Sequence, residues 1–164
     1  MADMQLSKAP VAKTGMLIHR PVEQVFEAIV DPRITSKFWF SKGSGRLETG
    51  KKAHWDWESH DVSIDVTAKA VEPNRRVLIE WPGYTGTTEV EWTFQPLPDG
   101  TTFVRVQESG WKDDADKLVR YVADSTEGFT IMLAGLKALL EHDIRLNLVP
   151  DRYPKGIEEQ ASGE

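Results

Sequence analysis

The feature that most constrains this chain is a pair of tryptophans one residue apart, Trp55 and Trp57, in the run KAHWDWE over residues 52–58. Successive side chains of a β-strand point to opposite faces, so the two indoles share one face and the polar residues beside them share the other. Indole rings bury large areas. The run therefore predicts a strand in a wide sheet that wraps around something bulky, either a helix of the protein or a guest molecule.

The composition indicates one domain. With 164 residues and a hydrophobic content of 40%, the chain is long enough to bury its own core. It has no cysteine, which excludes disulfides, thiol chemistry and zinc–thiolate sites. Its net charge of −6 and its scattered basic residues argue against nucleic-acid binding. The N-terminus lacks the apolar core of a signal peptide, and no stretch is apolar enough to insert in a membrane, so we expect a cytoplasmic protein.

The first part of the chain predicts a strand followed by two helices. The strand covers residues 12–19. Pro21 suits the first position of a helix, where its missing N–H costs nothing, and apolar residues at helical spacing follow as far as Ile29. The Asp–Pro pair at 31–32 ends this helix, because the residue before a proline avoids the helical conformation. A second short helical turn is expected at residues 34–38.

The rest of the chain predicts more strands and then a long helix. The expected strands cover residues 51–59, 62–70, 77–81, 87–95 and 101–109. A helical pattern then runs from the acidic residues at 113–116 to about residue 141. Gly128 and Gly135 lie inside it, and each costs about 0.5–1 kcal/mol relative to alanine. They indicate a close backbone approach, a kink near residues 124–125, or room for something else.

These elements fit together as an α+β helix-grip fold. A helix of about 25 residues spans roughly 37 Å and a ten-residue strand spans about 33 Å, so their lengths match. We expect a curved antiparallel sheet of about six strands wrapped around the long C-terminal helix, with two short helices between the first two strands. The domain is expected at residues 11–149, with tails at 1–10 and 150–164.

Three segments resemble the helix-grip superfamily (SRPBCC) that includes START domains, Bet v 1-like proteins and polyketide cyclases. Within it the chain is similar to the branch related to the C-terminal domain of the Hsp90 ATPase activator Aha1. The matching segments are residues 18–28, the Asp–Pro pair at 31–32 with Trp39, and residues 128–141. Many relatives carry tryptophan where this chain has Phe26 and Phe129. The resemblance implies a cavity between the sheet and the long helix, which in some members holds a lipid, a sterol or another apolar ligand.

The inward-facing aromatic residues are either closed core or the lining of such a cavity. Trp111, in the segment that leads into the long helix, is expected at the cavity mouth. The predicted ligand-binding residues are Trp39, Phe40, Trp55, Trp57, Trp81, Trp92, Glu108, Phe129 and Met132.

Glu108 is the most interesting acid of the sequence. It follows Val104 and Val106 at strand spacing, which places it on the inward face. A carboxylate beside apolar walls would serve as an acid or base, or would orient a ligand. The alternative is a strand-end acid that reaches solvent or a helix terminus.

A possible metal cluster lies on the opposite face of the tryptophan strand. His54, Asp56 and Glu58, with His60 or Asp61 nearby, are suitable ligand types. Because the tryptophans claim the inward face, we expect these residues to form a solvated surface, with no metal and no cofactor. The sequence also has no nucleophile motif and no phosphate-binding loop.

These observations favour a binding module for a small apolar molecule, lipid-like or aromatic, held between the sheet and the C-terminal helix. One alternative is an Hsp90 co-chaperone-like or stress-related domain that binds a protein through its outer surface. A second alternative is a cyclase- or hydrolase-like enzyme that uses the inward acid Glu108. The superfamily shares no catalytic residue, so enzymatic activity is the less expected outcome. The sequence leaves the oligomeric state open.

Overall fold

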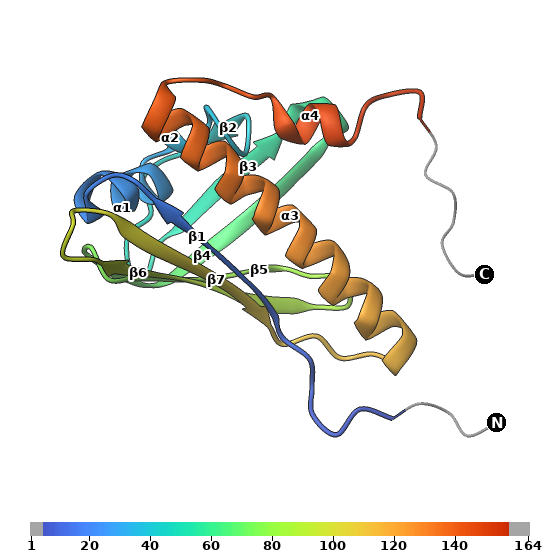
Figure 1. The fold of residues 1–164 in the computed structure, drawn as a ribbon. Helices are drawn as coiled ribbons and strands as arrows, with labels where there is room; N and C mark the ends of the chain where they lie inside the picture. Colours follow the sequence, from blue (N-terminus) through green and yellow to red (C-terminus); the bar gives the residue numbers. More distant parts are fainter. Residues whose placement is uncertain (1–4, 158–164) are drawn as a thin grey trace.

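Seven antiparallel strands form one curved sheet, and a long helix lies across it in the computed structural model, which describes residues 5–157 (Figure 1). The first strand pairs with the last, and the order across the sheet is β1-β7-β6-β5-β4-β3-β2. The strands are β1 (Ala12–Ile18), β2 (Lys42–Gly43), β3 (Lys52–Trp57), β4 (Val62–Glu72), β5 (Arg76–Pro82), β6 (Thr87–Pro96) and β7 (Thr102–Ser109). The helices are α1 (Val22–Val30), α2 (Pro32–Thr35), the 3-10 turn η1 (Glu58–His60), α3 (Ala115–His142) and α4 (Leu148–Arg152).

The predicted α+β helix-grip fold is confirmed, with differences at the ends of elements. The sheet contains one strand more than expected, the two-residue β2. Pro21 precedes α1 as an extended N-cap residue, so the expectation of a helical position for it is wrong. Pro32 instead occupies the first turn of α2, and the Asp31 side chain caps that helix. The expected boundary between domain and C-terminal tail falls inside α4, whose Val149 is buried.

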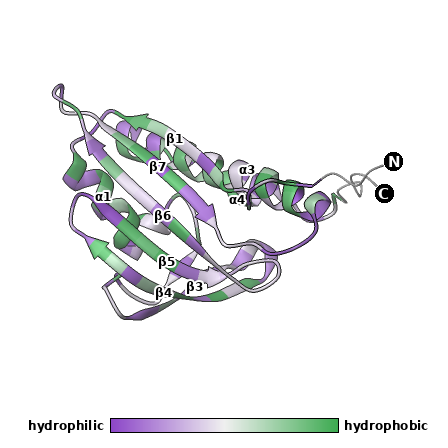
Figure 2. Ribbon diagram, turned by 90° about the horizontal axis from the view of Figure 1, so that it is seen from below, coloured by the Kyte–Doolittle hydropathy of each residue, from purple (hydrophilic) through white to green (hydrophobic). Residues whose placement is uncertain are grey.

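The tryptophan strand faces the core as its alternation predicts. Trp55 is 1% exposed and Trp57 is 8% exposed. They lie opposite Ile64 and Val62 of the antiparallel neighbour β4. Hydrophobic and hydrophilic bands both occur along β5, β6 and β7, as expected for strands with one buried face (Figure 2). A bulge in β4 shifts the register beyond Ala68.

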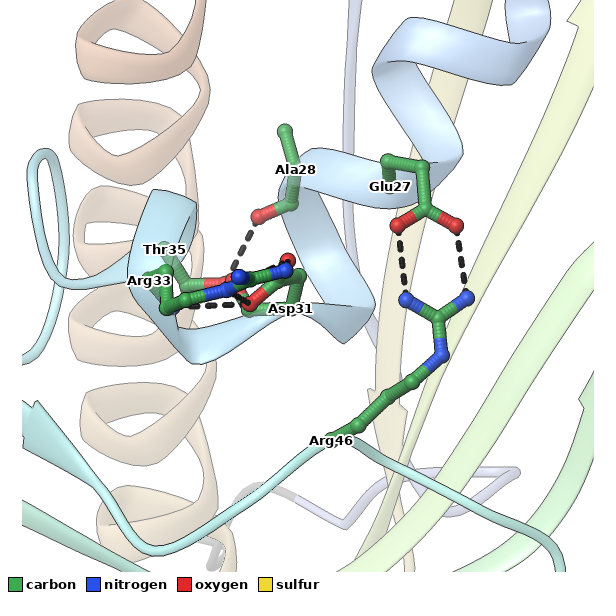
Figure 3. A network of polar contacts seen from close by, with 6 residues as sticks. All are labelled: Glu27, Ala28, Asp31, Arg33, Thr35 and Arg46. Carbon is green, nitrogen blue, oxygen red and sulfur yellow. Dashed lines mark hydrogen bonds and ion pairs between the residues drawn. The ribbon is translucent and has the colours of Figure 1, made fainter.

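The side chains of Asp31, Arg33 and Thr35 form a polar corner between α1 and α2, which sets the direction of the chain after α2 (Figure 3). The Thr35 hydroxyl donates to the carbonyl oxygen of Ala28 at 2.7 Å, so it fastens α2 to the end of α1. Asp31 accepts hydrogen bonds from the backbone and guanidinium of Arg33, which lowers the pKa of Asp31. The carbonyl of Thr35 accepts the backbone N–H of Trp39 at 3.0 Å. The corner therefore sets the position of the Trp39 indole under the long helix.

The long helix α3 has caps that match its sequence. The Asp114 side chain accepts the backbone N–H of Lys117, and the helix ends where Asp143 adopts a left-handed conformation. Its buried face contacts the sheet core and packs along β1. The buried residues of α3 are Leu118, Ser125, Phe129, Met132, Leu133, Gly135, Leu136 and Leu139.

The two glycines of α3 have different surroundings. A Cβ atom added to Gly135 would lie 3.0 Å from the Phe38 carbonyl oxygen and 3.3 Å from its Cβ, so this glycine permits a close approach of the chain. A Cβ atom added to Gly128 would meet nothing within 4 Å, so this glycine leaves open space. Two of the three expected explanations therefore apply, each to one glycine, and α3 is one continuous helix through residues 124–125 (Figure 1).

Substituting the two glycines by alanine should move stability in opposite directions. We expect Gly128→Ala to raise the free energy of unfolding by about 0.5–1 kcal/mol, because alanine is the better helix former and has room. We expect Gly135→Ala to lower it, because the crowding of Phe38 costs ~1–3 kcal/mol, which exceeds the helix gain. Urea unfolding followed by circular dichroism measures both. Equal stabilisation by the two alanines would contradict this account.

Candidate functional site

A pocket of about 330 Å³ lies between the middle of α3, the end of β5 and the aromatic residues beneath them. Its rim includes the exposed residues Tyr84 and Asp124, and its inner walls include the buried Phe129 and Trp57. The volume falls in the range of small-molecule sites. The lining residues are Trp39, Trp57, Trp81, Pro82, Gly83, Tyr84, Glu108, Asp124, Ser125, Gly128 and Phe129.

Trp39 is the centre of the aromatic wall. Its ring centroid lies 5.2 to 6.0 Å from the centroids of six other aromatic rings. Those rings belong to Phe40, Trp55, Trp57, Trp81, Trp92 and Phe129. Trp81 and Phe129 also stack on one another at 5.7 Å. Rings from α2's exit, β3, β5, β6 and α3 thus form one contiguous surface, part of which faces the pocket.

Glu108 forms the polar end of the pocket. It is 5% exposed, so the structure has it inside rather than reaching solvent at the strand end. One carboxyl oxygen accepts hydrogen bonds from Trp81 Nε1 at 2.8 Å and from the Thr88 hydroxyl at 2.6 Å. The other accepts the Ser125 hydroxyl at 2.7 Å. Glu108 therefore joins β5, β6, β7 and α3 at one point.

A tyrosine closes the outer side of the pocket. The Tyr84 hydroxyl donates to Asp124 of α3 at 3.1 Å, and its ring stacks on Tyr121 with centroids 4.2 Å apart. Desolvation and then the Asp124 carboxylate raise the pKa of Tyr84, so its hydroxyl stays a donor. The next residue, Thr85, donates its hydroxyl to the Lys112 carbonyl at 2.9 Å. The β5–β6 turn is thus held against α3 and the segment that precedes it.

The structure divides the predicted ligand-binding residues into two groups. Five of them line the pocket, namely Trp39, Trp57, Trp81, Glu108 and Phe129. The other four are buried at 2% exposure or less and do not line this pocket, namely Phe40, Trp55, Trp92 and Met132. Strand alternation predicts which side chains face inward but not which of them border the pocket, so it cannot separate these groups.

Trp111 does not line the pocket, so its expected place at the mouth is wrong. It is 4% exposed and packs with Ala12 and Leu118 in a second, smaller cluster. Its ring lies 6.4 Å from that of Tyr121, which in turn stacks on Tyr84. Trp111 therefore contacts the pocket rim only indirectly, through Tyr121.

The predicted ligand-binding residues omit six residues that line the pocket, namely Pro82, Gly83, Tyr84, Asp124, Ser125 and Gly128. Ser125 and Gly128 carried a signal, because small or polar residues interrupt an apolar helix stripe there. The residues at 82–84 lie in the connection between the predicted strands at 77–81 and 87–95. No local pattern indicates that this turn folds back against a helix some 40 positions later in the chain.

The outward face of β3 forms a solvated polar network. His54 lies between Asp65, at 2.8 Å from Nδ1, and Asp56, at 3.1 Å from Nε2. Glu58 pairs instead with Lys42 at 2.7 Å. Over residues 5–157, no group of three His, Cys, Asp or Glu side chains is arranged to hold a metal ion.

The sequence from residue 19 to residue 141 matches the family model described as Activator of Hsp90 ATPase homolog 1-like protein. This match spans about three quarters of the chain. The chain belongs to this family. The predicted resemblance to the Aha1-like branch of the helix-grip superfamily is therefore confirmed. None of the curated proteins matches the sequence.

Several solved structures share the fold of this Aha1-like family member. Protein SSP2350 from Staphylococcus saprophyticus is 32% identical, with 84% of this chain and 96% of that chain covered and a TM-score of 0.72. DynU16, from the dynemicin biosynthetic locus, is 24% identical, with 82% of this chain and 48% of that chain covered and a TM-score of 0.71. The Aha1 dimer from Colwellia psychrerythraea is 21% identical, with 81% of this chain and 97% of that chain covered and a TM-score of 0.68. The last two show the fold alone.

Within residues 5–157, every helix is too short or too polar to span a lipid bilayer.

The outward network predicts the titration of His54. The hydrogen bond to Asp65, helped by Asp56, raises the pKa of His54 above its ordinary value. Protonated His54 therefore stabilises the fold below the pKa of the unfolded chain, and this contribution is lost as pH rises through the folded-state pKa. We expect Asp65→Asn to lower the pKa of His54, which a pH titration followed by NMR of the imidazole protons measures. Asp116→Asn, at an exposed position of α3, is the control and should leave it unchanged.

Proposed function

We propose that this protein is a binding module that holds a small, largely aromatic or apolar molecule in the pocket beneath the middle of α3. The observation that carries the proposal is the pocket itself: about 330 Å³ of accessible space lie beside three indoles and the buried carboxyl group of Glu108. Membership in a helix-grip family, whose fold often binds hydrophobic ligands, agrees with this function.

The dimensions of the pocket narrow the class of ligand. Ligand sites usually measure about 300–1,000 Å³, so this one is at the small end. Flat rings of Trp39, Trp81 and Phe129 offer rigid surfaces for stacking. A compact molecule with one or two rings suits this space better than a long acyl chain.

Ligand binding should change the tryptophan fluorescence. Three of the six indoles, those of Trp39, Trp57 and Trp81, line the pocket, so a bound apolar molecule replaces the water beside them. We expect a saturable shift or quenching of the emission when aromatic compounds of one or two rings are titrated. Compounds that leave the emission unchanged, and that give no heat by calorimetry, would argue against the proposal.

Filling the pocket from α3 should remove binding without unfolding the protein. Gly128 faces open space, so we expect Gly128→Leu to occupy the pocket and to weaken ligand binding by about tenfold or more, since a leucine side chain displaces the ligand's contacts. Ala123→Leu adds the same group at an exposed position of the same helix and is the matched control. Unchanged ligand affinity in a folded Gly128→Leu protein would place the binding site elsewhere.

A second candidate function is an interaction with Hsp90, and the family match favours it. It would use the outer surface rather than the pocket. We expect stimulation of the Hsp90 ATPase rate if the candidate is right, and Gly128→Leu should leave that stimulation intact. An unchanged ATPase rate at high concentration of this protein would remove the candidate.

A further inference from the structure

We propose that the ligand carries a positively charged, hydrogen-bond-donating group, such as a primary amine, next to its aromatic part. This inference rests on the proposed binding function and specifies the chemistry of the molecule bound. It follows from the charges of the pocket, from the surroundings of Glu108 and from the aromatic wall beside it.

The charge of the pocket has one sign. Among the described residues that line it, Glu108 and Asp124 are acidic, and none is lysine, arginine or histidine. A ligand with a carboxylate or a phosphate would bring a second negative charge into this space without a partner. Such like-charge contacts are strongly unfavourable away from water. The pocket therefore selects against anionic molecules.

Glu108 lacks a cationic partner within residues 5–157. Its carboxyl group is buried, and its three hydrogen-bond partners, Trp81, Thr88 and Ser125, are all neutral. The three partners all carry an N–H or O–H group, so they suit a carboxylate that accepts through both oxygens. Buried charges in proteins are usually paired, because neutral donors replace only part of their hydration. A cation on the ligand would supply the missing partner.

The carboxylate also has room for one more donor. Two oxygens offer about four acceptor positions, and the protein uses three of them. The oxygen that accepts only the Ser125 hydroxyl keeps a free position. Glu108, Ser125 and the indole of Trp81 all line the pocket, so a donor group on a ligand can meet this end of it.

The aromatic wall favours the same group. Trp39, Trp57 and Trp81 line the pocket together with Glu108. The faces of indole rings carry negative electrostatic potential and attract ammonium groups, most strongly where water is excluded. An amine between a buried carboxylate and indole rings gains from both, whereas a neutral hydroxyl group gains only a hydrogen bond.

The test compares three ligands with one naphthalene skeleton by calorimetry at neutral pH. They are 1-naphthylmethylamine, 1-naphthalenemethanol and 1-naphthoic acid, which are cationic, neutral and anionic. We expect the amine to bind about tenfold or more tightly than the alcohol, because hydrogen bonds to charged partners are the stronger ones, and the acid to bind most weakly. An amine no tighter than the alcohol, or an acid that binds tightest, would overturn the inference and leave the binding function standing. Failure of all three to bind would count against the binding function itself.

Glu108→Gln identifies the group responsible. This variant keeps the side-chain size and removes the charge, so we expect the advantage of the amine over the alcohol to disappear while the alcohol still binds. Glu23→Gln, an exposed acid on α1, is the matched control and should keep the full advantage. Near-ultraviolet circular dichroism checks that the variant is folded. Asp124→Asn at the rim is the second variant and should reduce the advantage by less, so a full advantage in both pocket variants would assign the preference to other residues.

Discussion

The packing of the Trp39 indole against its aromatic neighbours is the interaction on which the rest of this structure depends. The ring comes from a short turn rather than from the sheet, yet it contacts residues of β3, β5, β6 and α3. Its backbone is held by Thr35, whose hydroxyl is fastened to the end of α1. The polar corner of Figure 3 therefore affects packing beyond its own contacts, because it positions Trp39, whose indole spans the space between the sheet and α3.

Glu108 belongs both to the pocket and to the contacts that hold the fold together. Burying a carboxylate costs free energy unless hydrogen bonds replace its hydration, and here three neighbouring elements each supply a donor. The same bonds hold α3 to the sheet beside the pocket. The residue proposed to orient a ligand is therefore also a cross-link between α3 and the sheet. The change to glutamine is informative because it retains the side-chain volume.

Sequence reasoning reached the fold because its signals are local. Alternation put Trp55, Trp57 and Glu108 on the inner face, and apolar periodicity gave α3 nearly its full length. The limits of the pocket depend on contacts between distant segments. Trp55 and Trp57 share one face of one strand, yet only Trp57 reaches the pocket, because depth depends on what lies above each ring. Tyr84 joins the site only because its turn folds against α3.

The pocket persists for reasons that the neighbouring side chains make clear. Close packing normally removes empty space, since voids forfeit dispersion contacts. Here the helix offers no side chain at Gly128, and the lining rings are rigid and already packed on one another, with Trp57 edge to face against Trp39 and Phe129 tilted against it. Moving a ring into the gap would break those contacts, and closing the gap entirely would bury Glu108 more deeply without giving it a cation. The mutual packing of the aromatic rings and the cost of burying Glu108 further both oppose closure of this space, which the proposed cationic aromatic ligand would fill.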